Sequence, residues 1–228
     1  MIAQQSGCCS YLAGSRKEFI LVDPLIDVDR YTKKLEQEGG KLVGVVDTHV
    51  HADHISGSRE LQKITACPIY MHETTLVKFP YTSLAEKEYQ MAGLKVQILH
   101  TPGHAPEHIS LLIEDKTVLT GDTLLVKDVG RVDLGRGNAN QLYDSIFNKL
   151  LQLEDHVQVM PGHVGKAHYV SGKNSSTIGQ ERRNNPALQV KTRSEFLQYM
   201  MEGWPPKPAN YEQCIKINSG LLEEKTQL

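Results

Sequence analysis

The most informative segment of this 228-residue chain is Thr48-His49-Val50-His51-Ala52-Asp53-His54. It places three imidazoles and one carboxylate within seven residues, directly after the apolar run 41–46. Imidazole nitrogens and carboxylate oxygens are the ligands that zinc, iron and similar cations take. The stretch therefore predicts a metal site, against the alternative of solvated loop histidines.

Three more potential ligands stand at the ends of short apolar runs. His104 follows Pro102-Gly103, Asp122 follows Gly121, and His163 follows Pro161-Gly162. Strand ends in a layered sheet meet at one rim, and glycine and proline let the following loops turn sharply. We expect all three side chains to converge on the first cluster. A turn histidine and an N-capping aspartate are the alternatives for His104 and Asp122.

Hydrophobic periodicity predicts strands that alternate with helices, which is typical of a layered α/β domain. The expected strands are 18–22, 41–46, 68–71, 94–99, 109–113, 117–119 and 157–160. The expected helices are one capped by Asp27 and ending near Glu38, one at 59–64, one at 141–153 capped by Asn138 or Asn140, and one opened by the capping-box spacing Thr192-Arg193-Ser194-Glu195 and ending near Gly203. We expect a single domain over 1–228, with 186–228 a C-terminal helix and a loop-like tail packing on it.

Charge and hydropathy exclude some classes of partner. The chain has 25 basic and 27 acidic side chains, so no global field favours nucleic acid or an anionic membrane. No apolar stretch approaches the ~20 residues that span a bilayer, and the amino terminus lacks a secretory pattern. We expect a cytoplasmic protein that binds neither nucleic acid nor membrane.

The four cysteines, Cys8, Cys9, Cys67 and Cys214, have neither paired zinc spacing nor the density of a disulfide scaffold. We expect reduced, mostly structural thiols. Cys8 and Cys9 are adjacent, so a redox-active pair is an alternative to small packing residues.

Taken together, these segments resemble the metallo-β-lactamase superfamily, with its His-x-His-x-Asp-His signature followed by a histidine, an aspartate and a final histidine. The resemblance covers about 11–165 and implies a four-layer αββα sandwich. The matching residues are His49, His51, Asp53, His54, His104, Asp122 and His163.

The resemblance leaves two reactions open, because fold alone does not choose the chemistry. In the persulfide dioxygenase subfamily one ferrous ion is held by two histidines and one aspartate, here His49, His104 and Asp122. The other four positions are then outer-sphere groups. Asp53 would orient ligands or bound water, and His51 and His54 are further candidates for that role. In the glyoxalase II type of thioesterase the same seven residues hold two zinc ions, so counting ligands does not separate the two.

Two other segments favour the oxygenase. Gly130-Arg131-Val132-Asp133 is similar to a Gly-Arg-x-Asp block that persulfide dioxygenases carry after the aspartate ligand, and 181–186 is similar to their Glu-Arg-x-x-Asn-Pro region. Val164-Gly165-Lys166 resembles the branch that is often fused to rhodanese domains, although this chain is too short to contain one. A separate sulfurtransferase is therefore an expected partner, and relatives suggest a homo-oligomer.

The subfamily resemblance implies oxidation of a low-molecular-weight persulfide, such as glutathione persulfide, by O₂ to sulfite and free thiol. Arg131 is either a contact to a substrate carboxylate or half of an ion pair with Asp133, and we favour the ion pair. Four residues could recognise an anionic thiol carrier: Lys166, Tyr169, Lys173 and Arg182. Each could equally be a solvated surface residue. A non-enzymatic metal-binding or sensory protein is a third possibility.

Overall fold

The computed structural model describes residues 2–5, 7–164, 174–201 and 203–223. Within them the strands form two six-stranded sheets and one short hairpin. The first sheet runs in the order β1 (Ile2–Gln5), β2 (Cys8–Ser15), β3 (Glu18–Val22), β4 (Lys41–Val46), β5 (Ile69–His72) and β6 (Thr82–Leu84). The second runs in the order β14 (Ser176–Thr177), β13 (Gln158–Pro161), β10 (Thr117–Gly121), β9 (Ile109–Ile113), β8 (Leu94–His100) and β7 (Glu88–Met91). The hairpin pairs β11 (Leu124–Leu125) with β12 (Asp128–Val129).

The main core lies between the two sheets. Ile20 and Val46 of the first sheet share one buried cluster with Ile98 and Leu111 of the second. Side chains alternate between the two faces of a strand, so each sheet can contribute one apolar face to this core and the other to a layer of helices. The strands predicted at 18–22, 41–46 and 109–113 have the expected bounds.

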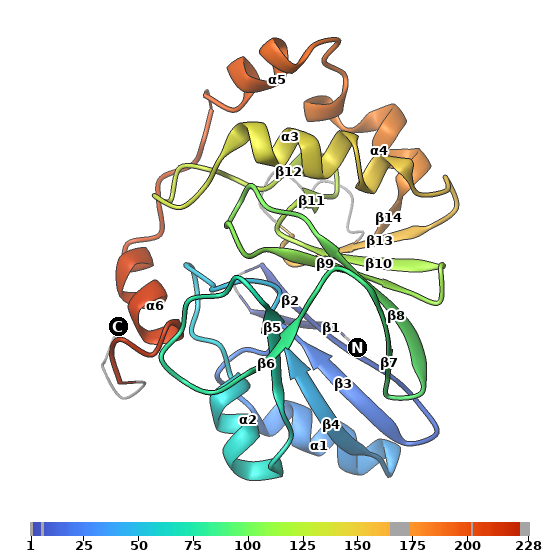
Figure 1. The fold of residues 1–228 in the computed structure, drawn as a ribbon, viewed down its shortest axis with the longest axis vertical. Helices are drawn as coiled ribbons and strands as arrows, with labels where there is room; N and C mark the ends of the chain where they lie inside the picture. Colours follow the sequence, from blue (N-terminus) through green and yellow to red (C-terminus); the bar gives the residue numbers. More distant parts are fainter. Residues whose placement is uncertain (1, 6, 165–173, 202, 224–228) are drawn as a thin grey trace.

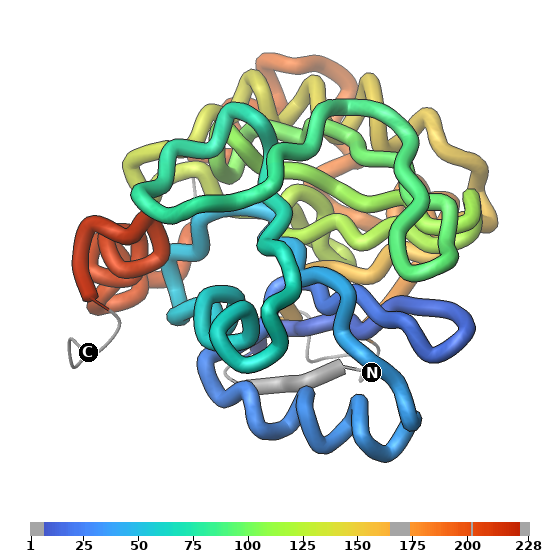
Figure 2. Tube along the Cα trace, turned by 60° about the horizontal axis from the view of Figure 1, so that its bottom comes forward, coloured from blue at the N-terminus to red at the C-terminus, as the bar shows by residue number. Residues whose placement is uncertain are grey.

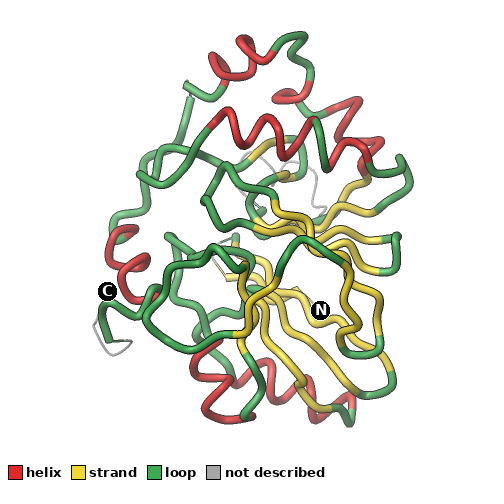
Figure 3. Tube along the Cα trace, in the orientation of Figure 1, coloured by secondary structure: helices red, strands yellow, loops and turns green. Residues whose placement is uncertain are grey.

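Helices cover the outer face of each sheet (Figures 1 and 3). The first sheet packs on α1 (Asp29–Glu38) and α2 (Ser58–Thr65) through Tyr31 and Leu61, and the second on α3 (Ala139–Phe147), α4 (Ile178–Asn184) and α5 (Arg193–Tyr199). The four-layer αββα prediction is thus confirmed. No helix in the described ranges combines the length and apolar character that crossing a membrane requires.

Predicted helix boundaries are wrong at α1 and α3. Asp27 does not cap α1: the N-cap is Val28, and the Asp27 carboxylate accepts hydrogen bonds from Arg30 instead. The helix predicted over 141–153 ends at Phe147 and resumes as a 3₁₀ turn at Leu150–Gln152. Its predicted Asn138 cap is present, with the side chain accepting from the next helical amides.

The C-terminal region differs most from expectation. The helix opened by Thr192 is capped as predicted but ends at Tyr199, and the tail expected to be loop forms a further helix, α6 (Tyr211–Asn218). A helix of eight residues is marginal in isolation. Tertiary contacts hold it, since Cys214 and Ile217 pack on Ile55, and it lies beside the loop that carries the histidine cluster (Figure 2).

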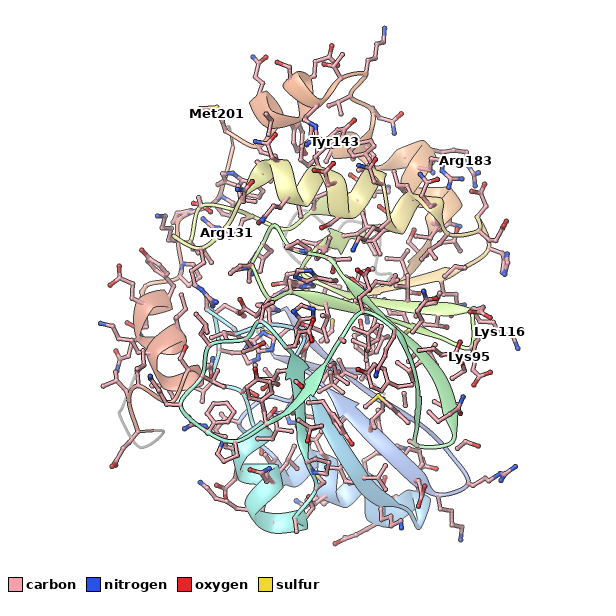
Figure 4. The ribbon with its side chains drawn as sticks, in the orientation of Figure 1. Lys95, Lys116, Arg131, Tyr143, Arg183 and Met201 are labelled. Carbon is pink, nitrogen blue, oxygen red and sulfur yellow. The ribbon has the colours of Figure 1, made fainter. Side chains whose placement is uncertain are left out.

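We expect Phe196→Ala to lower the free energy of unfolding by about 3–5 kcal/mol. Phe196 is fully buried and makes edge contacts with Tyr143 and Phe147 of α3, and Tyr143 is labelled in Figure 4. Met201→Ala is the control: Met201 is 83% exposed, and its loss should change the value by less than about 0.5 kcal/mol. Chemical denaturation of both variants measures the difference. Equal, small effects would show that α5 does not belong to the cooperative core.

Candidate metal centre

The structure brings His49, His104 and Asp122 together from three separate segments. One ligand atom from each lies within 4.8 Å of the other two. The Nε2 atoms of His49 and His104 are 3.9 Å and 3.7 Å from Asp122 Oδ2. The three residues follow the strands β4, β8 and β10, so the predicted convergence of strand ends is observed.

Hydrogen bonds fix which nitrogen of each ring is free. His104 Nδ1 lies 2.8 Å from the Arg131 carbonyl oxygen, which can only accept, so Nδ1 carries the proton. Thr48 Oγ1 gives its single proton to Asp23, so it must accept from His49 Nδ1. Both rings therefore direct the lone pair of Nε2 toward Asp122, as histidine ligands of a metal do.

The surroundings keep His49 neutral and available. Burial, followed by the neighbouring imidazoles, lowers the pKa of His49 well below its usual value. His49 Nε2 is buried and has no hydrogen-bond partner among the residues described. An unpaired buried acceptor facing a carboxylate is costly unless a cation lies between them, so this donor set fits a divalent metal.

His108 positions the Asp122 backbone, a role that the sequence did not reveal. Its Nε2 accepts from the Asp122 amide, and its Nδ1 lies 3.0 Å from the Thr123 hydroxyl. Burial lowers the pKa of His108 to about 3, so the ring stays neutral and keeps this pattern. Gly121, with φ +47°, lets the chain turn here, since a Cβ would lie 2.5 Å from His108 Nε2.

The Gly130–Asp133 block supports two of the three clustered residues. A Cβ on Gly130 would lie 1.7 Å from the Asp122 carbonyl oxygen, which explains why the block begins with glycine. The Arg131 carbonyl oxygen accepts a hydrogen bond from His104. The guanidinium of Arg131 donates to both carboxylate oxygens of Asp133, at 2.7 Å and 2.9 Å. The ion pair favoured from the sequence is present. Figure 4 places Arg131 below α3, on the side of the molecule where α6 lies.

His51 belongs to a neighbouring buried group with Asp23 and Asp47. Its Nε2 lies 3.2 Å from Asp23 Oδ1, and its Nδ1 is buried without a partner in the described ranges. Asp47 accepts hydrogen bonds from the hydroxyls of Ser56 and Ser58. Neither carboxylate was expected from the sequence, because each stands outside the histidine motif.

The remaining predicted residues form a second group around Asp53. His163 lies between two carboxylates, with Nδ1 2.7 Å from Asp122 Oδ1 and Nε2 2.8 Å from Asp53 Oδ2. Burial opposes the charged ring, but these carboxylates raise the pKa of His163 well above its usual value. His54 Nδ1 lies 3.1 Å from the same Asp53 oxygen. Cys8, expected to be a packing residue, also contacts Asp53.

Asn218 of α6 fastens the histidine loop from the far end of the chain. Its side-chain amide donates to the carbonyl oxygens of His51 and His54 at 2.8 Å each, and its Oδ1 accepts from the Ser56 amide. Three hydrogen bonds from one buried side chain thus fix the backbone of the motif. The sequence analysis missed Asn218 because it predicted a loop, and not a helix, in this part of the chain.

The structure does not bring every candidate to the centre. Arg182, on α4, binds Asp155 and the carbonyl oxygens of Leu151 and Leu153, and none of these partners belongs to the three groups described above. The remaining candidates, Lys166, Tyr169 and Lys173, lie outside the described residues.

A comparison of the sequence with models of protein families identifies the family. The model of the metallo-beta-lactamase superfamily matches residues 5–163. The chain belongs to the metallo-β-lactamase superfamily, as its motifs predicted.

Within that superfamily the chain is similar over nearly its whole length to proteins named persulfide dioxygenase ETHE1. The mitochondrial protein of Bos taurus is 29% identical over 223 residues, which cover 96% of this chain and 85% of that protein. The crystal structure of ETHE1 from Myxococcus xanthus has a TM-score of 0.89 and 34% identity, covering 97% of both chains. The hydroxyacylglutathione hydrolase GloC of Haemophilus influenzae is also 29% identical, covering 81% of this chain and 93% of that protein.

We expect Asn218→Asp to weaken metal retention by ~10 to 100-fold, the usual effect of losing a group that orients a ligand. The change keeps an acceptor for Ser56 but loses the two donors to the histidine loop. Competition with a chromophoric chelator measures the affinity. Asn184→Asp is the control, because Asn184 is exposed on α4 and binds a helix carbonyl. Equal affinity in both variants would contradict a role for α6 at the centre.

Proposed function

We propose that this protein is an iron-dependent persulfide dioxygenase, which oxidises a low-molecular-weight persulfide such as glutathione persulfide to sulfite and free thiol in sulfur metabolism. One persulfide, one O₂ and one water give one thiol, one sulfite and two protons. The observation that carries the proposal is the meeting of two histidines and one aspartate, with Nε2 of His49 buried and unpaired in the described structure. The similarity to proteins named persulfide dioxygenase supports it.

Two imidazoles and one carboxylate suit a ferrous ion, because a facial set of three leaves coordination positions open. When bound, the ion would supply adjacent sites for the persulfide sulfur and for O₂. By holding the ion, His49, His104 and Asp122 would bring the two reactants close together, and proximity of this kind lowers the barrier to reaction.

Neighbouring residues orient His49, His104 and Asp122 so that the three can bind one ion. His163 donates to Oδ1 of Asp122, so that oxygen is engaged and Oδ2 is left facing the Nε2 atoms of His49 and His104. The Arg131 carbonyl and the Thr48 hydroxyl hold the two rings in the ligating tautomer. Asp53 in turn holds His163, which supports the orienting role expected for it.

The second candidate is a dinuclear zinc thioesterase of the hydroxyacylglutathione hydrolase type. Two observations favour it: Nδ1 of His51 and Nε2 of His54 are also buried without partners in the described ranges, and the Haemophilus influenzae relative has that name. The contacts of Gly130 and Arg131 with Asp122 and His104 favour the oxygenase, since they supply the physical reason for the Gly-Arg-x-Asp block. We further propose that a sulfurtransferase supplies the persulfide and that the enzyme is a homo-oligomer.

Protein purified without oxygen should contain about one iron per chain and should take up O₂ on addition of glutathione persulfide. Elemental analysis and an oxygen electrode measure the two quantities, and sulfite is assayed in the product. Two zinc ions per chain, with hydrolysis of S-lactoylglutathione and no O₂ uptake, would reject the dioxygenase in favour of the thioesterase.

His49→Ala and Asp122→Ala should each lower iron content and O₂ uptake by more than the ~10 to 100-fold typical of losing a supporting hydrogen bond. Each removes a member of the trio itself. His100→Ala is the matched control, because His100 stacks on His72 at 4.0 Å and binds the Pro106 carbonyl, outside the cluster. Wild-type iron content in His49→Ala would refute the assignment of this residue.

A further inference from the structure

Glu107 is a buried acidic residue that belongs to none of the three groups described above. It is 1% exposed. Its Oε1 accepts a hydrogen bond from the Val50 amide at 3.0 Å, and its Oε2 accepts one from Nη2 of Arg136 at 2.6 Å. Burying a carboxylate is costly unless the group is paired and hydrogen-bonded, so both contacts are needed to keep Glu107 where it lies.

The contact between Glu107 and Val50 joins two segments that carry members of the trio. Val50 directly follows His49, and Glu107 stands three residues after His104. Val50 is buried, and a buried amide that loses its acceptor carries the full cost of its desolvation. The hydrogen bond therefore fixes where the histidine loop lies relative to the turn that follows His104.

The loop that follows β12 contacts all three segments that carry the trio. As described above, its first two residues lie against the Asp122 backbone and bind the ring of His104. Further along the same loop, Arg136 reaches the third segment through Glu107, which binds the Val50 amide. One loop thus helps to fix the positions of the three segments relative to one another.

We propose that Glu107 and Arg136 are a positioning pair for the trio. Glu107 sets the separation of His49 from His104. Arg136 holds the Glu107 carboxylate in the orientation that binds the Val50 amide. Both residues act through the backbone of the histidine loop. The proposal concerns the assembly of the metal centre, so it goes beyond the dioxygenase function and does not depend on which reaction the centre performs.

The difference between a carboxylate and an amide makes the pair testable. Glutamate accepts hydrogen bonds on both oxygens, whereas glutamine has one acceptor oxygen and an NH₂ group that donates. Glu107→Gln can therefore accept from Val50 or from Arg136, and its NH₂ group then faces the other donor. Arg136→Met leaves a buried carboxylate without its cation. In the double variant the glutamine oxygen can accept from Val50, and its NH₂ group no longer faces a guanidinium.

Co²⁺ binding to the metal-free protein, measured without oxygen, tests the proposal. The visible cobalt absorption that His49→Ala lacks reports the trio, and competition with a chromophoric chelator gives its affinity. Glu107→Gln and Arg136→Met should each weaken this affinity by ~10 to 100-fold and change the cobalt spectrum, because each loses a contact that orients the ligands. The double variant should bind more tightly than Arg136→Met and return toward the wild-type spectrum.

Glu86→Gln and Lys149→Met are the matched controls. Glu86 also accepts from one backbone amide, that of His100, and binds one cation, Lys149 at 2.6 Å, but it is exposed and does not join two segments of the trio. Neither control should change the affinity or the spectrum of the bound cobalt.

Wild-type affinity and spectrum in Glu107→Gln, or a double variant that binds no better than Arg136→Met, would overturn the proposal. Arg136 is partly exposed, so its variants keep the test decisive if Glu107→Gln does not fold. Arg136→Lys, which keeps the charge, should then retain more of the affinity than Arg136→Met. Absence of O₂ uptake by the iron-loaded protein would reject the dioxygenase function and leave these cobalt measurements unchanged.

Discussion

The rest of the centre depends on the contacts made by the buried residue Asp122. Its amide is held by His108, its Oδ1 by His163, and its Oδ2 faces the two histidines of the trio. Burial alone would raise the pKa of Asp122, but the charge and hydrogen bond of His163 lower it below its usual value. A permanent negative charge is therefore kept in the interior, where the protonated ring of His163 lies beside it.

The position of Asp122 follows from the sandwich. The strand β10 pairs with β9 on one side and β13 on the other, and its register with β13 shifts between Leu119 and Gly121. The chain turns at Gly121, where φ is +47°, and the next residue, Asp122, lies close to His49 and His104, which follow β4 and β8. Two sheets packed face to face thus supply rigid strand ends, and each short loop carries one or two polar side chains to the same place.

Much of this was predictable from the sequence, because apolar runs and ligand residues are local signals. The strands before His49, His104 and Asp122 were found from their periodicity, and the family pattern predicted that these residues meet. Cys8, His108 and Asn218 were not found. Their roles depend on distant partners: a backbone bridge between Cys8 and His163, a hydrogen bond from the Asp122 amide to His108, and a helix that is marginal without tertiary contacts. None of these leaves a pattern in neighbouring residues.

The hydrogen bonds of Asn218 to the histidine loop form only late in the synthesis of the chain. Residues His51 and His54 are synthesised early, yet the side chain that fixes their backbone is added more than 160 positions later. A nascent chain still emerging from the ribosome can assemble both sheets while its motif remains loosely held. A translation product that ends before Asn218 would therefore carry the histidine motif without these three hydrogen bonds.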